Sequence, residues 1–188
     1  GLTEQASVSQ YRLASHLAVA LVIFSLLIWT GFDLRDGSAK SPEGHGMVSL
    51  GLLGITILAG ALVAGMDAGL LYNHYPLMGT GLVPVEYGEA GWLDPFENPA
   101  SAQFHHRWIA AVTFGAVVVS AINARRQGLR LRGNLVLGAV VVQFILGIVT
   151  LLHGVQVALG GMHQAGAVLL LGCLLALLHG ESHHHQNI

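Results

Sequence analysis

Long runs of apolar residues alternate along the chain with stretches rich in glycine, proline and charge. The apolar runs cover residues 11–32, 46–69, 100–122, 134–153 and 162–179. A bilayer core of about 30 Å is spanned by about 20 mostly apolar residues in a helix. Continuous runs, rather than short alternating segments, favour helices over a transmembrane barrel. The pattern therefore predicts an all-α fold, a polytopic membrane bundle of five transmembrane helices.

The composition supports a membrane protein. Hydrophobic residues make up 53% of the 188 residues and charged residues only 10%, which is far from the balance of a soluble domain. The net charge of -2 gives no indication of a nucleic-acid partner, and we expect none. The single cysteine, Cys173, lies within a predicted helix, where we expect it to pack. The chain begins with Gly1, and its first residues lack the layout of a signal peptide, so we expect further sequence upstream.

Basic residues indicate which side of the membrane each loop faces, because short basic loops lie on the cytoplasmic side. Residues 123–132 hold half of all the lysines and arginines: Arg125, Arg126, Arg130 and Arg132. Residues 33–45, with Arg35 and Lys40, face the same side if each run crosses the membrane once. The long connection 70–99 then lies outside, where we expect it to cap the outer face.

Three histidines fall at one predicted depth near the outer face. His16, His106 and His163 each lie just inside the start of a helix that enters from outside. An ionisable group inside a membrane helix indicates a functional site by default, and neutral imidazole is a common haem ligand in helix bundles. Ala110 follows His106 by four positions and Gly166 follows His163 by three, which would leave space for a porphyrin between helices.

Alternatives remain open for these residues and their neighbours. The histidines could instead form hydrogen bonds between helices, with the small residues serving close packing. His105 is rotated by about 100° from His106 around the helix, so we expect it at the interface rather than on the ligand face. Arg12 and Arg107 could each pair with a haem propionate or extend to lipid phosphates. We expect Asp67 to anchor the outer loop rather than to face a cofactor.

Several motifs resemble heme A synthase of the mitochondrial and alphaproteobacterial type. They are VSQYRLASHL (8–17), AGMDAGLLYNHYPLMG (64–79), FENPASAQFHHR (96–107), LGIVTLL (146–152) and MHQAGAVLLL (162–171). The resemblance covers nearly the whole chain and implies a protein of eight helices in two similar four-helix halves. It implies three parts here: the last helix of the amino-terminal half-bundle with an inner loop (1–45), a carboxy-terminal four-helix haem-binding bundle (46–180), and a polar tail (181–188).

The same resemblance implies roles for individual residues. His106 and His163 would be the axial iron ligands of a haem b, with Arg107 also binding this cofactor. His16 and Arg12 would belong to the site of the substrate haem, whose other histidine would lie in a helix upstream of this chain. The implied reaction oxidises a ring methyl of haem O to the formyl group of haem A, with water as the oxygen source. At His105 the family leads us to expect an acidic residue instead.

The resemblance also implies a cellular setting. It is the bacterial plasma (inner) membrane or the mitochondrial inner membrane, with the haem sites near the outer face. The implied partners are the lipid bilayer, haem O, an amino-terminal half or another chain that supplies it, and haem O synthase or cytochrome oxidase assembly factors. Two other hypotheses remain: a membrane cytochrome b that transfers electrons without chemistry of its own, and a haem-free helical bundle or transporter part.

Overall fold

The computed structural model describes residues 9–37 and 44–184, and within them it is all-α. The predictions for Lys40 and for most of the polar tail lie outside the residues whose side chains are described. Five helices are long and apolar enough to cross a membrane, which confirms the predicted class. They are α1 (Gln10–Asp36), α2 (His45–Gly65), α4 (Pro99–Arg126), α5 (Arg130–Leu152) and α6 (Val157–His184).

Six helix ends lie four or five residues from the predicted bounds, and beside two of them non-glycine residues adopt left-handed backbone conformations. α2 ends at Gly65 rather than at residue 69, since Asp67 has a φ of 51° and a short 3-10 turn, Ala68–Leu70, follows it. α6 begins at Val157 instead of residue 162. The tight turn before it is closed at Val155, which also has a φ of 51°.

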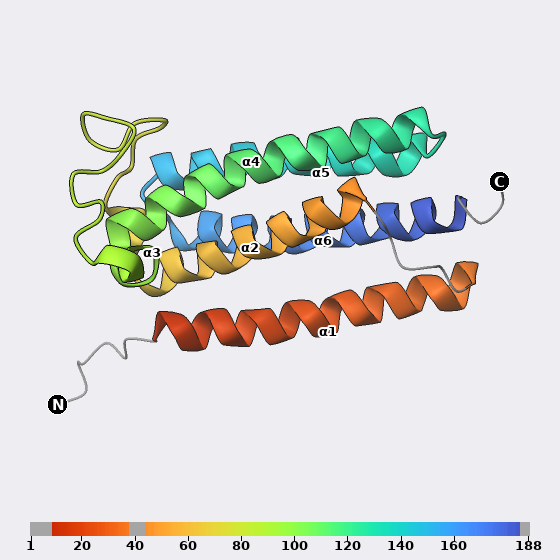
Figure 1. The fold of residues 1–188 in the computed structure, drawn as a ribbon, viewed down its shortest axis with the longest axis horizontal. Helices are drawn as coiled ribbons and strands as arrows, with labels where there is room; N and C mark the ends of the chain where they lie inside the picture. Colours follow the sequence, from red (N-terminus) through yellow and green to blue (C-terminus); the bar gives the residue numbers. More distant parts are fainter. Residues whose placement is uncertain (1–8, 38–43, 185–188) are drawn as a thin grey trace.

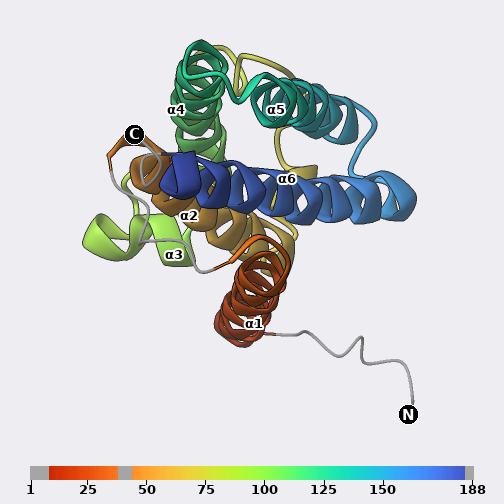
Figure 2. The ribbon, with the colours of Figure 1, turned by 90° about the vertical axis from the view of Figure 1, so that its right-hand side faces the viewer.

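Four of the long helices form a ring, and α1 lies outside it. α2 packs against α4, α4 against α5, α5 against α6, and α6 against α2, while α1 packs against α2 and α6. Figure 2 shows α1 on one side of α6 and α2, with α4 and α5 on the other side. The order of contacts around the ring places α4 and α6 at opposite corners.

The two ends of the ring differ in character (Figure 1). One end holds the starts of α1, α4 and α6 together with the long loop, residues 66–98, which includes the short helix α3 (Asp94–Glu97). We call it the loop end. The other end holds the turn between α4 and α5, next to Arg125, Arg126 and Arg130. We call it the arginine end.

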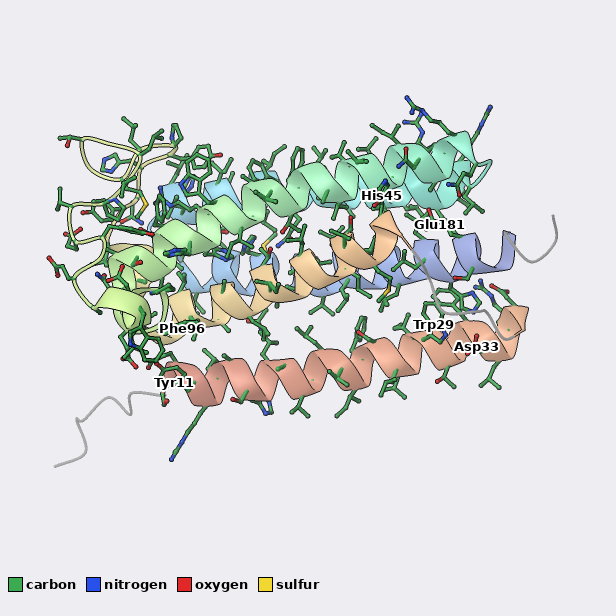
Figure 3. All side chains as sticks on the ribbon, viewed as in Figure 1. Tyr11, Trp29, Asp33, His45, Phe96 and Glu181 are labelled. Carbon is green, nitrogen blue, oxygen red and sulfur yellow. The ribbon has the colours of Figure 1, made fainter. Side chains whose placement is uncertain are left out.

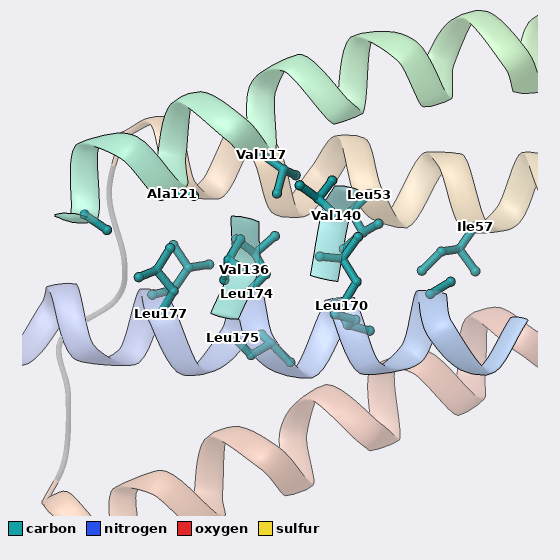
Figure 4. Close-up of a cluster of buried hydrophobic side chains, with 14 residues drawn as sticks. Leu53, Ile57, Val117, Ala121, Val136, Val140, Leu170, Leu174, Leu175 and Leu177 are labelled. Atoms are coloured by element: carbon teal, nitrogen blue, oxygen red, sulfur yellow. The ribbon is translucent and has the colours of Figure 1, made fainter. Parts of the chain in front are cut away.

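The apolar core lies between the ring helices, as Figure 4 shows, and most of its members lie nearer the arginine end. Its buried members come from all four ring helices: Leu53, Ile57, Val117, Ala121, Ala124, Val136, Val140, Ala167, Leu170, Leu171, Leu174, Leu175, Leu177 and Leu178. Because lipid is as apolar as leucine, this cluster holds the helices together by close packing. Towards the loop end the cluster stops at Ile57 on α2 and at Ala167 on α6.

α1 contains no buried residue, yet it is attached to the ring near both of its ends. At the loop end, a Cβ added to Gly65 would come 2.6 Å from the Cα of Gln10. At the arginine end, the fully buried His179 of α6 donates from Nε2 to Oδ1 of Asp33 at 3.0 Å. Trp29 packs edge-on against the His179 ring, and Figure 3 shows Trp29 and Asp33 at this end of α1.

Candidate functional site

His106 lies in α4 and its ring is held against α2. Its Nδ1 lies 3.2 Å from the carbonyl oxygen of Thr56. A carbonyl only accepts hydrogen bonds, so Nδ1 carries the proton and Nε2 keeps a lone pair. The ring lies over Gly60, where an added Cβ would come 3.0 Å from Cε1 of His106. The glycine therefore makes the close approach of the ring possible.

His163 lies in α6 and is held in a similar way against α5. Its Nδ1 lies 3.1 Å from Nε2 of Gln143. The ring lies over Gly147, where an added Cβ would come 2.8 Å from Cε1. Gln143 precedes Gly147 by four residues on α5, just as Thr56 precedes Gly60 on α2. In both places a polar group and a glycine one turn further along the same helix position the imidazole.

The structure brings His106 and His163 together from opposite corners of the ring. Both side chains are half-buried, and each lies near the loop-end start of its helix. Neither Nε2 has a hydrogen bond to the described residues. No group of three or more histidine, cysteine, aspartate or glutamate residues suited to a metal ion occurs in the described part of the chain. Two protein ligands suit an iron whose other positions are filled by a porphyrin.

Arg107 connects α4 to the long loop. Its Nη1 donates to the carbonyl oxygens of His74 at 2.9 Å and Leu77 at 3.2 Å, and its Nη2 donates to that of Tyr72 at 2.5 Å. Its Nε is buried and has no partner among the described residues. The guanidinium therefore holds the loop, which is a role that the sequence did not suggest, and its Nε–H remains free to donate.

His105 also serves the long loop. Its Nδ1 lies 2.8 Å from the backbone oxygen of Ser101, and its ring stacks on that of Tyr87 with 5.6 Å between the centroids. The ring of Phe104 packs edge-on against it. His105 thus packs between Tyr87 of the loop and Phe104 of α4.

Asp94 and Asn98 order the loop immediately before α4. Asn98 caps the helix by accepting from the backbone N–H of Ser101 at 3.3 Å. The Asp94 carboxylate accepts from the backbone N–H groups of Gly88 at 2.8 Å and Ala90 at 3.0 Å. Burial by itself would raise the pKa of Asp94. Hydrogen bonds, that of Ser101 first, outweigh burial and lower the pKa to about 2.

His16, Arg12 and Asp67 are not brought to the histidine pair. His16 and Arg12 are exposed side chains near the start of α1, the helix outside the ring. Asp67 is exposed and its side chain caps no helix, although its backbone oxygen accepts from the N–H of Leu70 at 3.1 Å. Asp67 therefore orders the start of the loop through its backbone rather than its carboxylate.

The sequence analysis missed the groups that hold the two imidazoles. A signal exists for one of them, Gln143 in the segment QFILG (143–147) of α5. The carbonyl of Thr56 gives no such signal, because it belongs to the backbone and the hydroxyl of Thr56 bonds to Leu52 and Thr113 instead. Gln143 and Gly147 are one turn apart and share a helix face. A glutamine inside an apolar membrane helix is itself a functional signal.

A ring of apolar helices that brings two imidazoles together from opposite corners defines the class: a multi-pass helical membrane protein with a candidate bis-histidine site. The chain belongs to the COX15-CtaA family of cytochrome oxidase assembly proteins, whose model matches residues 1–175.

Curated relatives confirm the resemblance that the motifs indicated. The chain is 44% identical to the heme A synthase of Rhodospirillum centenum, over 95% of this chain and 51% of that protein. It is 41% identical to the heme A synthase of Caulobacter sp. (strain K31), over 91% of this chain and 53% of that protein. The chain spans about half the length of the curated relatives it matches. No solved structure matches the chain significantly.

Proposed function

We propose that this chain carries the b-type haem site of a haem A synthase, with His106 and His163 as the axial ligands of the iron. The observation that carries the proposal is that these two imidazoles, on α4 and α6, lie near the same end of the ring, each with Nδ1 against a group of a neighbouring helix. Axial ligands of a haem approach the iron from opposite faces, which helices at opposite corners of a ring can provide. A hydrogen bond donated by Nδ1 is the usual means of orienting a metal-ligating histidine, and His106 donates one to the carbonyl of Thr56.

The surrounding residues suit a planar group at this level of the ring. The buried apolar cluster ends on α2 at Ile57, level with His106, and on α6 at Ala167, one turn beyond His163. Gly60 and Gly147 let each imidazole lie flat against its neighbouring helix. The unpartnered Nε of Arg107 is a donor suited to a propionate. A haem bound there would supply one-electron transfer through its iron.

For the whole protein we propose the oxidation of a ring methyl of haem O to the formyl group of haem A, with water as the oxygen source. The support is the name heme A synthase of the curated relatives. On this proposal His16 and Arg12, on the exposed side of α1, contribute to the substrate haem site. Residues 1–45 then group with an amino-terminal half-bundle, and residues 46–180 form the haem-binding bundle.

We also propose that the loop end faces the outer side of a bacterial inner membrane. The basic residues at the opposite end, Arg125, Arg126 and Arg130, support a cytoplasmic position for that end. Both haem sites would then open near the outer face. The bilayer and haem O are the partners that this proposal requires.

Alanine substitution of each histidine tests the axial pair. We expect His106→Ala and His163→Ala each to abolish the bis-histidine absorbance of the purified protein, because each removes one of two axial bonds. His153→Ala is the matched control, since His153 is exposed near the same end and bonds only to Val149 of its own helix among the described residues. If both ligand variants kept full haem content and an unchanged spectrum, the axial assignment would be wrong.

A further inference from the structure

Gln143 is a polar side chain in the middle of the membrane-spanning helix α5, between Val142 and Phe144. Such a side chain is costly in lipid unless it is hydrogen-bonded. Its Nε2 lies 3.1 Å from Nδ1 of His163 and donates to the backbone oxygen of His163 at 2.9 Å. Its Oε1 is buried and has no hydrogen-bond partner among the described residues.

The amide of Gln143 is closely confined beside the imidazole. A Cβ added to Gly166, on the facing side of α6, would overlap its Oε1. Gly147, one turn along α5, leaves the space in which the ring of His163 lies. The two glycines therefore leave the space in which the amide and the ring lie in contact, so a change in one changes the hydrogen bond of the other.

The chemistry of ligation fixes which atom of the amide must face the ring. An imidazole that binds iron through Nε2 carries its proton on Nδ1, so Nδ1 donates and its partner must accept. In the arrangement described, Nε2 of Gln143 faces Nδ1, which suits a ring protonated on Nε2. A half-turn of the amide exchanges the nitrogen and the oxygen. Together with a small shift away from the His163 carbonyl oxygen, which lies 2.9 Å from Nε2, this turn brings the unpartnered Oε1 to Nδ1. The bond to that carbonyl is given up, and the carbonyl keeps its helical partner.

We propose that Gln143 is a positioning residue for His163, whose amide turns so that Oε1 accepts from Nδ1–H when Nε2 binds the haem iron. The proposal rests on the proposed function of His163. The proposal also distinguishes His106 from His163 by the partner of each Nδ1 atom. His106 faces the carbonyl of Thr56, which only accepts, so its ring is fixed in the metal-binding tautomer. His163 has a partner that serves either tautomer.

Substitutions at Gln143 separate positioning from simple packing. Gln143→Leu keeps the approximate volume and removes the hydrogen bond, whereas Gln143→Glu keeps the shape and presents oxygen atoms only. Gln164→Leu is the matched control, because Gln164 is exposed beside His163 on α6. The measurements are haem affinity and the midpoint potential of the purified, haem-loaded protein. The potential responds to the hydrogen bond at Nδ1, which a space-filling role does not alter.

We expect Gln143→Leu to weaken haem binding on the order of tenfold and to raise the midpoint potential. We expect Gln143→Glu to retain haem and to lower the potential, since a stronger acceptor at Nδ1 makes the imidazole a stronger donor to iron. Gln164→Leu should change neither quantity. If Gln143→Leu does not fold, the Gln143→Glu variant is the remaining test. A midpoint potential of that variant equal to that of the wild type overturns the proposal.

The outcome for His163 separates this inference from the proposed function. If His163→Ala abolishes haem binding while Gln143→Leu leaves both affinity and potential unchanged, His163 remains a ligand and the positioning role is wrong. If His163→Ala binds haem with an unchanged spectrum, the proposed function fails, and the inference fails with it.

Discussion

Each candidate ligand lies over a glycine, and the absence of a side chain there sets the position of the ring. An added Cβ would lie 3.0 Å from His106 at Gly60 and 2.8 Å from His163 at Gly147. Favourable carbon–carbon contacts have separations of about 3.5–4.0 Å. A methyl group at either position would therefore push the imidazole away from the helix that bonds its Nδ1.

Alanine at these two glycines tests the position of the rings. We expect Gly60→Ala and Gly147→Ala each to reduce haem content on the order of tenfold, because the displaced ring loses its Nδ1 partner. The haem-to-protein ratio and the absorbance of the reduced protein measure the effect. Gly54→Ala on α2 and Gly138→Ala on α5 are matched controls, since an added Cβ meets nothing within 4 Å at either position. An equal loss in the controls would point to general packing instead of ring position.

At the residue scale, the sequence predicted the pair of histidines but not the groups that hold them. His106 and His163 could be singled out because an ionisable residue inside a membrane helix is conspicuous. The periodicity of a helix shows which of its residues share a face, but not which neighbouring helix that face meets. Gln143 and the carbonyl of Thr56 therefore became visible only in the structure. The loop carbonyls that Arg107 holds could not be predicted for the same reason.

At the scale of single elements, the approach to α4 depends on one carboxylate, Asp94. The structure lowers its pKa from the ordinary 3.8 to about 2. A carboxyl whose pKa is depressed by folding stabilises the folded form above its ordinary pKa. That contribution is lost as the pH falls through the pKa of the folded form.

The long loop should therefore loosen as the pH falls from about 4 to about 2, the window between the ordinary and the lowered pKa of Asp94. Hydrogen exchange of residues 82–97, corrected for the intrinsic effect of pH on exchange, measures this change. We expect Asp94→Asn to exchange faster above pH 4 and to show no added change in that window. A wild-type loop that stays equally protected throughout would show that Asp94 does not control it.

Element boundaries were predictable only where composition marks them. The apolar runs located all five long helices to within a few residues at most ends. The errors at the end of α2 and the start of α6 come from Asp67 and Val155. Both residues have positive φ angles, which the local sequence does not predict. A valine rarely adopts this conformation, so the turn before α6 depends on the helices that it joins.

At the scale of the whole molecule, the attachment of α1 at the loop end depends on close backbone contact with α2. We expect Gly65→Ala to destabilise the protein by about 1–3 kcal/mol, because the new methyl group overlaps the backbone at Gln10. Thermal unfolding in detergent measures the loss. Gly51→Ala on the same helix meets nothing within 4 Å and is the control. Equal melting temperatures for the two variants would show that this contact does not hold α1.

Apolar runs predict how many helices cross the membrane, but the order of helices around the ring comes from side-chain packing and is a property of the structure alone.

The placement of α4 and α6 at opposite corners has a thermodynamic consequence. A molecule bound by His106 and His163 would be linked to every helix of the ring, since α2 and α5 hold the two imidazoles. Unfolding would then require its release, and each tenfold rise in its free concentration above Kd would add about 1.4 kcal/mol to stability. The supply of such a molecule in the cell, as well as the sequence, would set how much of the protein is folded.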